Sequence, residues 1–317
     1  MKTSTQQTSR TEAVSVTAAL FAVYVVWGST YLAIRFAVES LPPLLMSGIR
    51  FLIAGGLMYA WLRFRGSPAP TRSQWRAVTM IGALMLVGGV GVVAIAEDVG
   101  VGSGVAATAI AAVPLWAAFW ARVLGERTTR LEAVGLIVGF VGVAVLATAG
   151  DLTANPLGAL LILLAPISWA FGSVWSKRLD LPQGAMATAA QMLAGGVLLL
   201  LVGYVSGERI SQAPSASSWL ALAYLIVFGS IVAYTSYMYL LRTVRPALAT
   251  SYAYANPVVA VFLGVTLGSE VITGRSLAAL PVILVGVGLL ASGRTGAIRR
   301  RRSVPTVDPV EAPCTSC

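Results

Sequence analysis

The sequence predicts an all-α integral membrane protein with ten transmembrane helices in a 5+5 inverted repeat and both termini in the cytoplasm. Three observations lead to this prediction: the apolar composition, the distribution of basic residues, and a similarity between the two halves of the chain. Of the 317 residues, 57% are hydrophobic and 11% are charged, whereas an ordinary soluble domain has about 25% charged residues. Most of the chain is therefore expected to lie in lipid.

Apolar runs recur along almost the whole chain. Each is close to the roughly 20 residues that a helix needs to cross a hydrocarbon layer of about 30 Å. The first run is too long for the apolar region of a signal peptide, so we expect it to remain as helix one. The ten predicted spans are 14–34, 44–62, 77–96, 101–121, 131–149, 157–176, 186–205, 219–241, 247–267 and 277–292.

Basic residues decide the predicted orientation, because cytoplasmic connections hold an excess of Lys and Arg. With the N-terminus inside, every Lys and Arg falls in a cytoplasmic loop or tail except Arg35, Arg50, Arg209 and Arg275. The predicted cytoplasmic tails are 1–13 and 294–317, and the second is expected to be basic and disordered. It ends with Cys314 and Cys317, for which a metal role is not favoured because further ligands are missing nearby.

The two halves of the chain resemble each other at a nearly constant offset. Trp27 and Arg35 are followed 142 positions later by Trp169 and Lys177. Two repeats, 14–149 and 150–293, follow from this pattern. Five crossings end on the opposite side from where they begin, so the second copy would be inverted, as in many secondary transporters. Further matches pair 54–56 with 194–196, Pro114 with Pro257, and 141–143 with 285–287.

Composition also argues against several classes of protein. The formal charge of +10 comes mainly from loops and tails, so it indicates topology rather than nucleic acid binding. The sequence contains no histidine, which removes most metal and triad chemistry. It lacks the Gly-x-x-x-x-Gly-Lys-Ser/Thr signature, so ATP is not expected as the energy source. We predict no enzyme activity, no cofactor and no metal site.

Several short stretches carry a resemblance to a known family. They are the sequences WGST at 27–30 with Arg35, GIRF at 48–51, VPLW at 113–116 and LGER at 124–127, and the long segment 228–257. Together they resemble the EamA family of the drug/metabolite transporter superfamily, and the last segment is closest to its YedA-like exporters. The resemblance implies ten helices, a central cavity built from helices one to four and six to nine, and export of small metabolites or drugs. The second repeat departs from the family pattern, because 267–270 reads LGSE.

Candidate substrate-binding residues lie in the helices that would line such a cavity. Arg50 lies inside helix two, where a guanidinium facing lipid would cost at least about 2.5–3.5 kcal/mol, so it must face protein or water. It could attract an anionic group of the substrate, such as a carboxylate, or it could snorkel outward or bind backbone carbonyls. Aromatic rings could hold flat or cationic solutes, although such rings also anchor helices at the membrane interface. The other candidates are Trp27, Tyr31, Trp116, Trp169, Trp175, Tyr234, Tyr237, Tyr252 and Asn256.

Two further sets of residues are candidates for coupling and for movement. Glu97, beside Asp98 at the end of helix three, is either a proton-coupling carboxylate or a solvated loop charge. Pro114 and Pro257 interrupt repeat-related helices, so they are either hinges or fixed kinks. The Gly-x-x-x-Gly pairs at 135–139 and 264–268 predict close helix contacts, more often inside the bundle than between subunits.

The predicted function is secondary active transport. The chain would export small organic metabolites or drugs, amino acids among them, across the cytoplasmic membrane by alternating access coupled to protons. The alternatives are an uncoupled facilitator or exchanger, an uptake carrier for amino acids, and, in another class, a membrane sensor or scaffold. The expected partners are a small-molecule substrate, the lipid bilayer, protons as coupling ion, and a homodimer partner as an open option.

Overall fold

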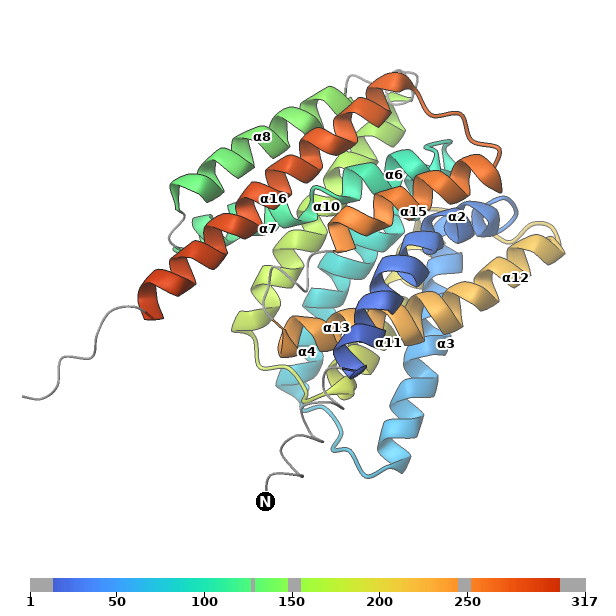
Figure 1. Ribbon diagram of the computed structural model, residues 1–317. Coiled ribbons are helices and arrows are strands. Elements are labelled where there is room, and N and C mark those ends of the chain that lie inside the picture. The colour runs from blue at the N-terminus through green and yellow to red at the C-terminus, as the bar shows by residue number, and fades with distance from the viewer. Residues whose placement is uncertain (1–13, 127–128, 148–154, 245–251, 303–317) are drawn as a thin grey trace, which may run out of the picture.

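The computed structural model describes residues 14–126, 129–147, 155–244 and 252–302, and these residues form a bundle of helices without a strand among them (Figure 1). The predicted all-α class is confirmed for this part of the chain. Seven helices are long and apolar enough to cross a membrane: Val14–Val38, Pro43–Phe64, Arg72–Asp98, Ser103–Val123, Pro156–Arg178, Ala185–Val205 and Ala216–Thr243. Two shorter helical stretches are also apolar, Ala255–Thr266 and Gly274–Leu289.

Several of these long helices contain more than one kind of helical turn. The first has a π-helical stretch, η1 (Ala22–Val26), before α2 (Trp27–Val38), and it is followed by α3 (Pro43–Phe64). The third and fourth are α4 (Arg72–Gly82), η2 (Ala83–Gly91) and α5 (Val92–Asp98), and then α6 (Ser103–Ile110) and α7 (Val113–Val123). The remainder are α8 (Arg130–Ala147), α10 (Pro156–Trp175), η3 (Ser176–Arg178), α11 (Ala185–Val205), α12 (Ala216–Tyr224), η4 (Leu225–Tyr234), α13 (Thr235–Thr243), α15 (Tyr252–Thr266) and α16 (Gly274–Arg302).

Helix α16 extends beyond the predicted end of the tenth span. The apolar run ends near residue 292, but the helix continues to Arg302 and so enters the segment that was predicted to be a disordered tail. Cys314 and Cys317 lie outside the described residues.

Equivalent helices of the two halves begin with equivalent caps. Thr71 and Gln74 form a capping box at the start of α4, in which the Gln74 backbone N–H donates to Thr71 Oγ1 at 3.2 Å. Ser215 lies 144 positions after Thr71 and accepts from the Ser218 backbone N–H at 3.1 Å at the start of α12. The internal similarity therefore extends to the local chemistry that starts these helices.

Equivalent helices also pack against one another. Helices α8 and α16 lie side by side at one edge of the bundle (Figure 1). A Cβ added to Gly142 would lie 2.8 Å from the backbone nitrogen of Ile283, and one added to Gly286 would lie 2.5 Å from the Cα of Gly139. Because Gly139 and Ile283, like Gly142 and Gly286, are 144 positions apart, the contact is reciprocal. The predicted close contact at Gly139 is confirmed inside the bundle.

The π-helical stretches η2 and η4 occupy corresponding places in the two halves, each following the capped helix just described. Short π-helical stretches occur often at functional sites, and η2 and η4 are longer than a single turn, at 9 and 10 residues. Here η1, η2 and η4 surround the centre of the bundle, and the residues they present there are described next.

Candidate functional site

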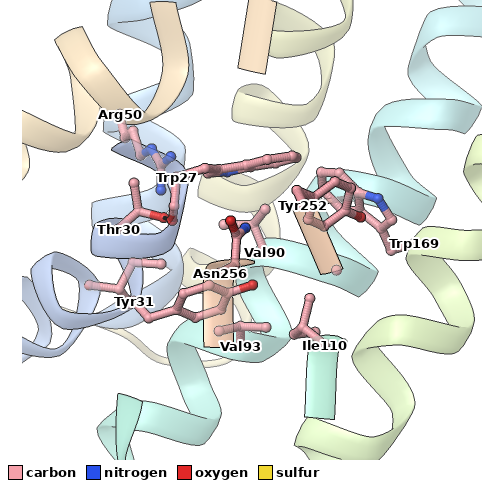
Figure 2. Close-up of a pocket in the computed structure, with 12 residues that line it drawn as sticks. Trp27, Thr30, Tyr31, Arg50, Val90, Val93, Ile110, Trp169, Tyr252 and Asn256 are labelled. Carbon is pink, nitrogen blue, oxygen red and sulfur yellow. Dashed lines mark hydrogen bonds between the residues drawn. The ribbon is translucent and has the colours of Figure 1, made fainter. Parts of the chain in front are cut away.

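A cavity lies in the centre of the bundle between helices of both halves (Figure 2). Helices α2, α3, η2, α5 and α6 of the first half and α10 and α15 of the second half contribute to its wall. Six of the predicted substrate-binding residues are among the twelve that line it. The lining residues are Trp27, Thr30, Tyr31, Ile34, Arg50, Gly89, Val90, Val93, Ile110, Trp169, Tyr252 and Asn256.

Five aromatic residues, which we call the aromatic cluster, pack together, and three of them line the cavity. They are centred on Trp27, whose ring centroid lies 5.6 Å from that of Trp169, 5.0 Å from Tyr237 and 5.3 Å from Tyr252. Tyr234 completes the cluster at 6.4 Å from Trp27. Tyr234 and Tyr237 are almost fully buried and support the rings of Trp27 and Trp169 without lining the cavity.

Trp27 and Trp169 are equivalent positions of the two halves, so their contact joins the halves at the centre of the molecule. Ring pairs at such distances contribute about 0.5–1.5 kcal/mol beyond the burial of their area. The cluster is therefore a stable packed element.

Trp116 and Trp175, two other predicted substrate-binding residues, lie away from this cavity. Trp116 packs edge-on against Phe140 of α8 with ring centroids 4.7 Å apart. Trp175 packs against Phe171 on its own helix at 5.7 Å. The ring contact of Trp116 therefore joins two helices, and that of Trp175 lies within one helix.

Arg50 faces the protein interior, as the cost of placing it in lipid requires. Its side chain is 2% exposed, and its Nε donates to Ser230 Oγ at 2.7 Å. Its Cζ lies 4.8 Å from the centre of the Phe51 ring. Nη1 has no hydrogen-bond partner among the described residues. In Figure 2 the guanidinium lies beside Thr30 and Trp27 at the edge of the cavity.

Asn256 lines the cavity and also ties α15 to the first helix. In the amide orientation that satisfies its neighbours, its nitrogen donates to the carbonyl oxygens of Val23 and Tyr24 at 2.8 and 3.1 Å. Both carbonyls belong to the π-helical stretch η1. The amide nitrogen of Asn256 is thus engaged by the protein itself.

The adjacent carboxylates Glu97 and Asp98 have opposite environments. Asp98 is exposed, as expected for a solvated loop charge. Glu97 is 4% exposed at the end of α5, and neither of its oxygens has a partner within the described part of the chain. A buried carboxylate that is ionised and unpaired is costly, so this geometry favours a neutral carboxyl group.

An ion pair beside Glu97 was not predicted from the sequence. Arg35 Nη1 donates to Glu270 Oε1 at 3.1 Å, and Glu270 also accepts from the backbone N–H groups of Ser103 and Gly104 at 2.9 and 3.2 Å. These amides begin α6, where a carboxylate is favoured by the helix dipole. We call Arg35, Glu97 and Glu270 the charged cluster, because Glu97 lies within electrostatic range of both other groups.

Sequence signals for this pair exist but are weak. Arg35 is one of four basic residues outside the cytoplasmic segments, and Glu270 follows the altered LGSE turn. Gly264 provides room for the carboxylate, since a Cβ there would lie 2.7 Å from Glu270 Oε2. Nothing in the sequence joins two residues that are 235 positions apart.

The two predicted hinge prolines have different structural settings. Pro114 lies in the first turn of α7, immediately after the break between α6 and α7, where its missing N–H leaves no helical bond unmade. Pro257 lies inside α15. The first half therefore has a broken helix where the second half has a continuous one within the described residues 252–266.

Comparisons with known proteins agree with this architecture. The model of the EamA-like transporter family matches the chain twice, over residues 15–148 and 156–292. The inner membrane transporter YedA of Escherichia coli K12 is 49% identical over 276 residues, which cover 87% of this chain and 90% of YedA. A probable amino-acid metabolite efflux pump of Salmonella typhimurium LT2 is 25% identical over 278 residues, covering 84% of this chain and 91% of the pump. One solved crystal structure shares the fold, with a TM-score of 0.61, 22% identity, and coverage of 89% of this chain and 99% of that one.

Proposed function

The chain belongs to the EamA-like transporter family and is a multi-pass membrane transporter of that type, and on this premise we propose that it is a proton-coupled exporter. It would carry small organic metabolites or drugs, amino acids among them, across the cytoplasmic membrane by alternating access. The observation that carries the proposal is the central cavity. Both halves contribute residues to its wall, and Trp27 of the first half contacts Trp169 of the second there. The relative from Salmonella, named as an efflux pump, supports export as the direction.

Alternating access is proposed to arise from a 5+5 inverted repeat with both termini in the cytoplasm. The reciprocal contacts of α8 with α16 and the equivalent caps at Thr71 and Ser215 support this arrangement. Two halves of similar structure and opposite orientation can exchange conformations, so that a central site opens first to one side and then to the other. Pro114 and Pro257 are the proposed hinges.

Glu97 is the proposed coupling residue. While it carries a proton, its buried position needs no counterion. Once it ionises, it requires a cation, and Arg35 is within electrostatic range. An ionised Glu97 would compete with Glu270 for Arg35 and so weaken the contact of Glu270 with the first turn of α6. Proton release would thereby weaken a contact between the two halves.

Flux in proteoliposomes tests this proposal. Vesicles that contain the purified protein are loaded with a mixture of amino acids and drugs, a pH gradient is imposed, and mass spectrometry identifies the solutes that cross. We expect one class of solute to become concentrated against its gradient. Glu97→Gln should abolish the concentrating step, while the matched control Glu39→Gln, at an exposed position, should retain it.

The other outcomes identify the alternatives. Flux that responds neither to the gradient nor to Glu97→Gln would indicate an uncoupled facilitator. If none of the solutes moves with folded protein, the export proposal is wrong and a sensor or scaffold is favoured.

A further inference from the structure

The charge of Arg50 is not explained by the proposed coupling mechanism. A guanidinium stays protonated in proteins, and this one is 2% exposed. Its hydrogen-bond partner among the described residues is the neutral hydroxyl of Ser230. The ion pair found in the described part of the chain joins Arg35 to Glu270 instead. Because a buried charge without a counterion is costly, this position calls for an anion, which the described part of the chain does not supply.

Two adjacent residues of η4 determine the position of the guanidinium: Ser230 binds it, and Gly229 leaves room for it. Ser230 accepts from Nε at 2.7 Å, which orients the group, and Nη1 has no partner among the described residues. Gly229 makes the room, since a Cβ there would lie 2.7 Å from Nη2 and 3.0 Å from a methyl carbon of Thr30. The terminal nitrogens of a guanidinium match the two oxygens of a carboxylate as a bidentate pair.

The rest of the cavity wall has a different chemistry. None of its twelve residues is acidic, and its largest surfaces are the rings of Trp27, Trp169 and Tyr252 with aliphatic side chains from η2, α5 and α6. Asn256 uses its amide nitrogen on η1. The wall therefore offers one fixed positive charge and flat apolar surfaces, but no carboxylate that could pair with an ammonium group.

We propose that the cavity selects organic monocarboxylates with a flat apolar body, and that Arg50 determines this specificity by binding the carboxylate. An amino group on the solute is dispensable. Aromatic amino acids and the corresponding acids without an amino group share the required chemistry, whereas the decarboxylated amines lack it. The inference rests on the proposed function in one respect, namely that this cavity is the transport site.

Three solutes with the same ring test the proposal by binding alone. Tryptophan carries both charged groups, indole-3-propionate carries only the carboxylate, and tryptamine carries only the amine. Each is added at equal concentration to the purified full-length protein in detergent, and the thermal unfolding temperature is measured. We expect the two carboxylates to raise it and tryptamine to leave it unchanged. Equal stabilisation by tryptamine and indole-3-propionate would overturn the proposal.

Variants then assign the selectivity to one residue. Arg50→Met should weaken the binding of indole-3-propionate by about 10- to 100-fold, the range for a hydrogen-bonded charge, and Ser230→Ala should weaken it less. Arg76→Met removes an exposed arginine and should bind normally. Wild-type affinity in a folded Arg50→Met protein would contradict the assignment. If that variant does not fold, Ser230→Ala and the three-solute series still decide.

Failure of this inference and failure of the export proposal are distinguishable. Carboxylate-dependent binding without flux of any solute would contradict transport and support the binding site. Flux of solutes irrespective of their carboxylate would support transport and contradict this inference alone.

Discussion

Two clusters of side chains in the middle of the molecule are held together by different kinds of interaction. The aromatic cluster around Trp27 contributes three rings to the cavity wall, whereas none of Arg35, Glu97 and Glu270 of the charged cluster lines the cavity. Arg35 follows Trp27 by eight residues on one helix, which corresponds to about 12 Å along its axis. The charged cluster consists of one ion pair, two backbone amides and a carboxyl group without a partner among the described residues, whereas the aromatic cluster consists of packed rings.

This difference indicates how each cluster can respond. A change in the protonation of one carboxyl group alters the charged cluster, because its carboxylates compete for one guanidinium. Packed rings have no comparable group, and they separate only when whole helices move. We therefore expect the charged cluster to respond to protons, and the aromatic cluster to separate through movement of the two halves.

Trp27→Ala should have the largest effect on stability, because it removes the central ring of the aromatic cluster. Loss of a fully buried Trp costs about 3–5 kcal/mol in the free energy of unfolding, and because Trp27 is only partly buried we expect about 3 kcal/mol. Denaturant or thermal unfolding in detergent measures the loss. Trp61→Ala, at a ring that is 58% exposed, is the matched control and should change little. Similar losses of unfolding free energy in the two variants would mean that the packing of the aromatic cluster does not stabilise the protein.

Glu270→Ala should have the next largest effect on stability, in the charged cluster. It leaves Arg35 and the amides of Ser103 and Gly104 without their acceptor. Removing one partner of a buried ion pair costs about 3–5 kcal/mol, and we expect about 2–3 kcal/mol because the Arg35 side chain is 36% exposed. The fall in unfolding temperature measures it, and Glu270→Gln, which retains one acceptor oxygen, should fall between. An unfolding temperature equal to that of the wild type in both variants would show that the ion pair does not stabilise the protein.

Tyr234→Phe should have the smallest effect. The Tyr234 hydroxyl is buried without a partner among the described residues, so its removal leaves no group unpaired, and stability should change by less than about 0.5 kcal/mol. The matched control is Tyr224→Phe, whose hydroxyl lies 2.6 Å from Ser29 Oγ, and it should lose about 1 kcal/mol. A larger loss for Tyr234→Phe than for Tyr224→Phe would reveal polar interactions within the aromatic cluster.

Hydropathy and family signatures identified the architecture in outline. Helical spans, membrane location and the EamA resemblance were all predicted from the sequence, and they are confirmed by the helices and the family match. Exactly ten crossings and the orientation of the termini stay predictions. For the site, the cost of inserting a guanidinium into lipid was enough to predict that Arg50 faces protein or water.

Tertiary structure decided which aromatic residues reach the cavity. Trp27 and Trp169 do so, whereas Trp116 packs against Phe140 of a neighbouring helix and Trp175 against Phe171 of its own helix. The sequence could not separate them, because in a membrane the face toward lipid and the face toward the protein interior are both apolar. Hydropathy therefore reports that a residue lies in the membrane but not which of its neighbours it touches.

The sequence by itself thus predicted the apolar helical stretches from composition, the duplication from spacing along the chain, and the family from the resemblance of short motifs. The fold alone decided three features of the site. It pairs Arg35 with Glu270, it places the Arg50 guanidinium against Gly229 and Ser230, and it buries Glu97. Each of these depends on helices that are far apart in the chain, and the energy of a charge depends on the distance to its partner.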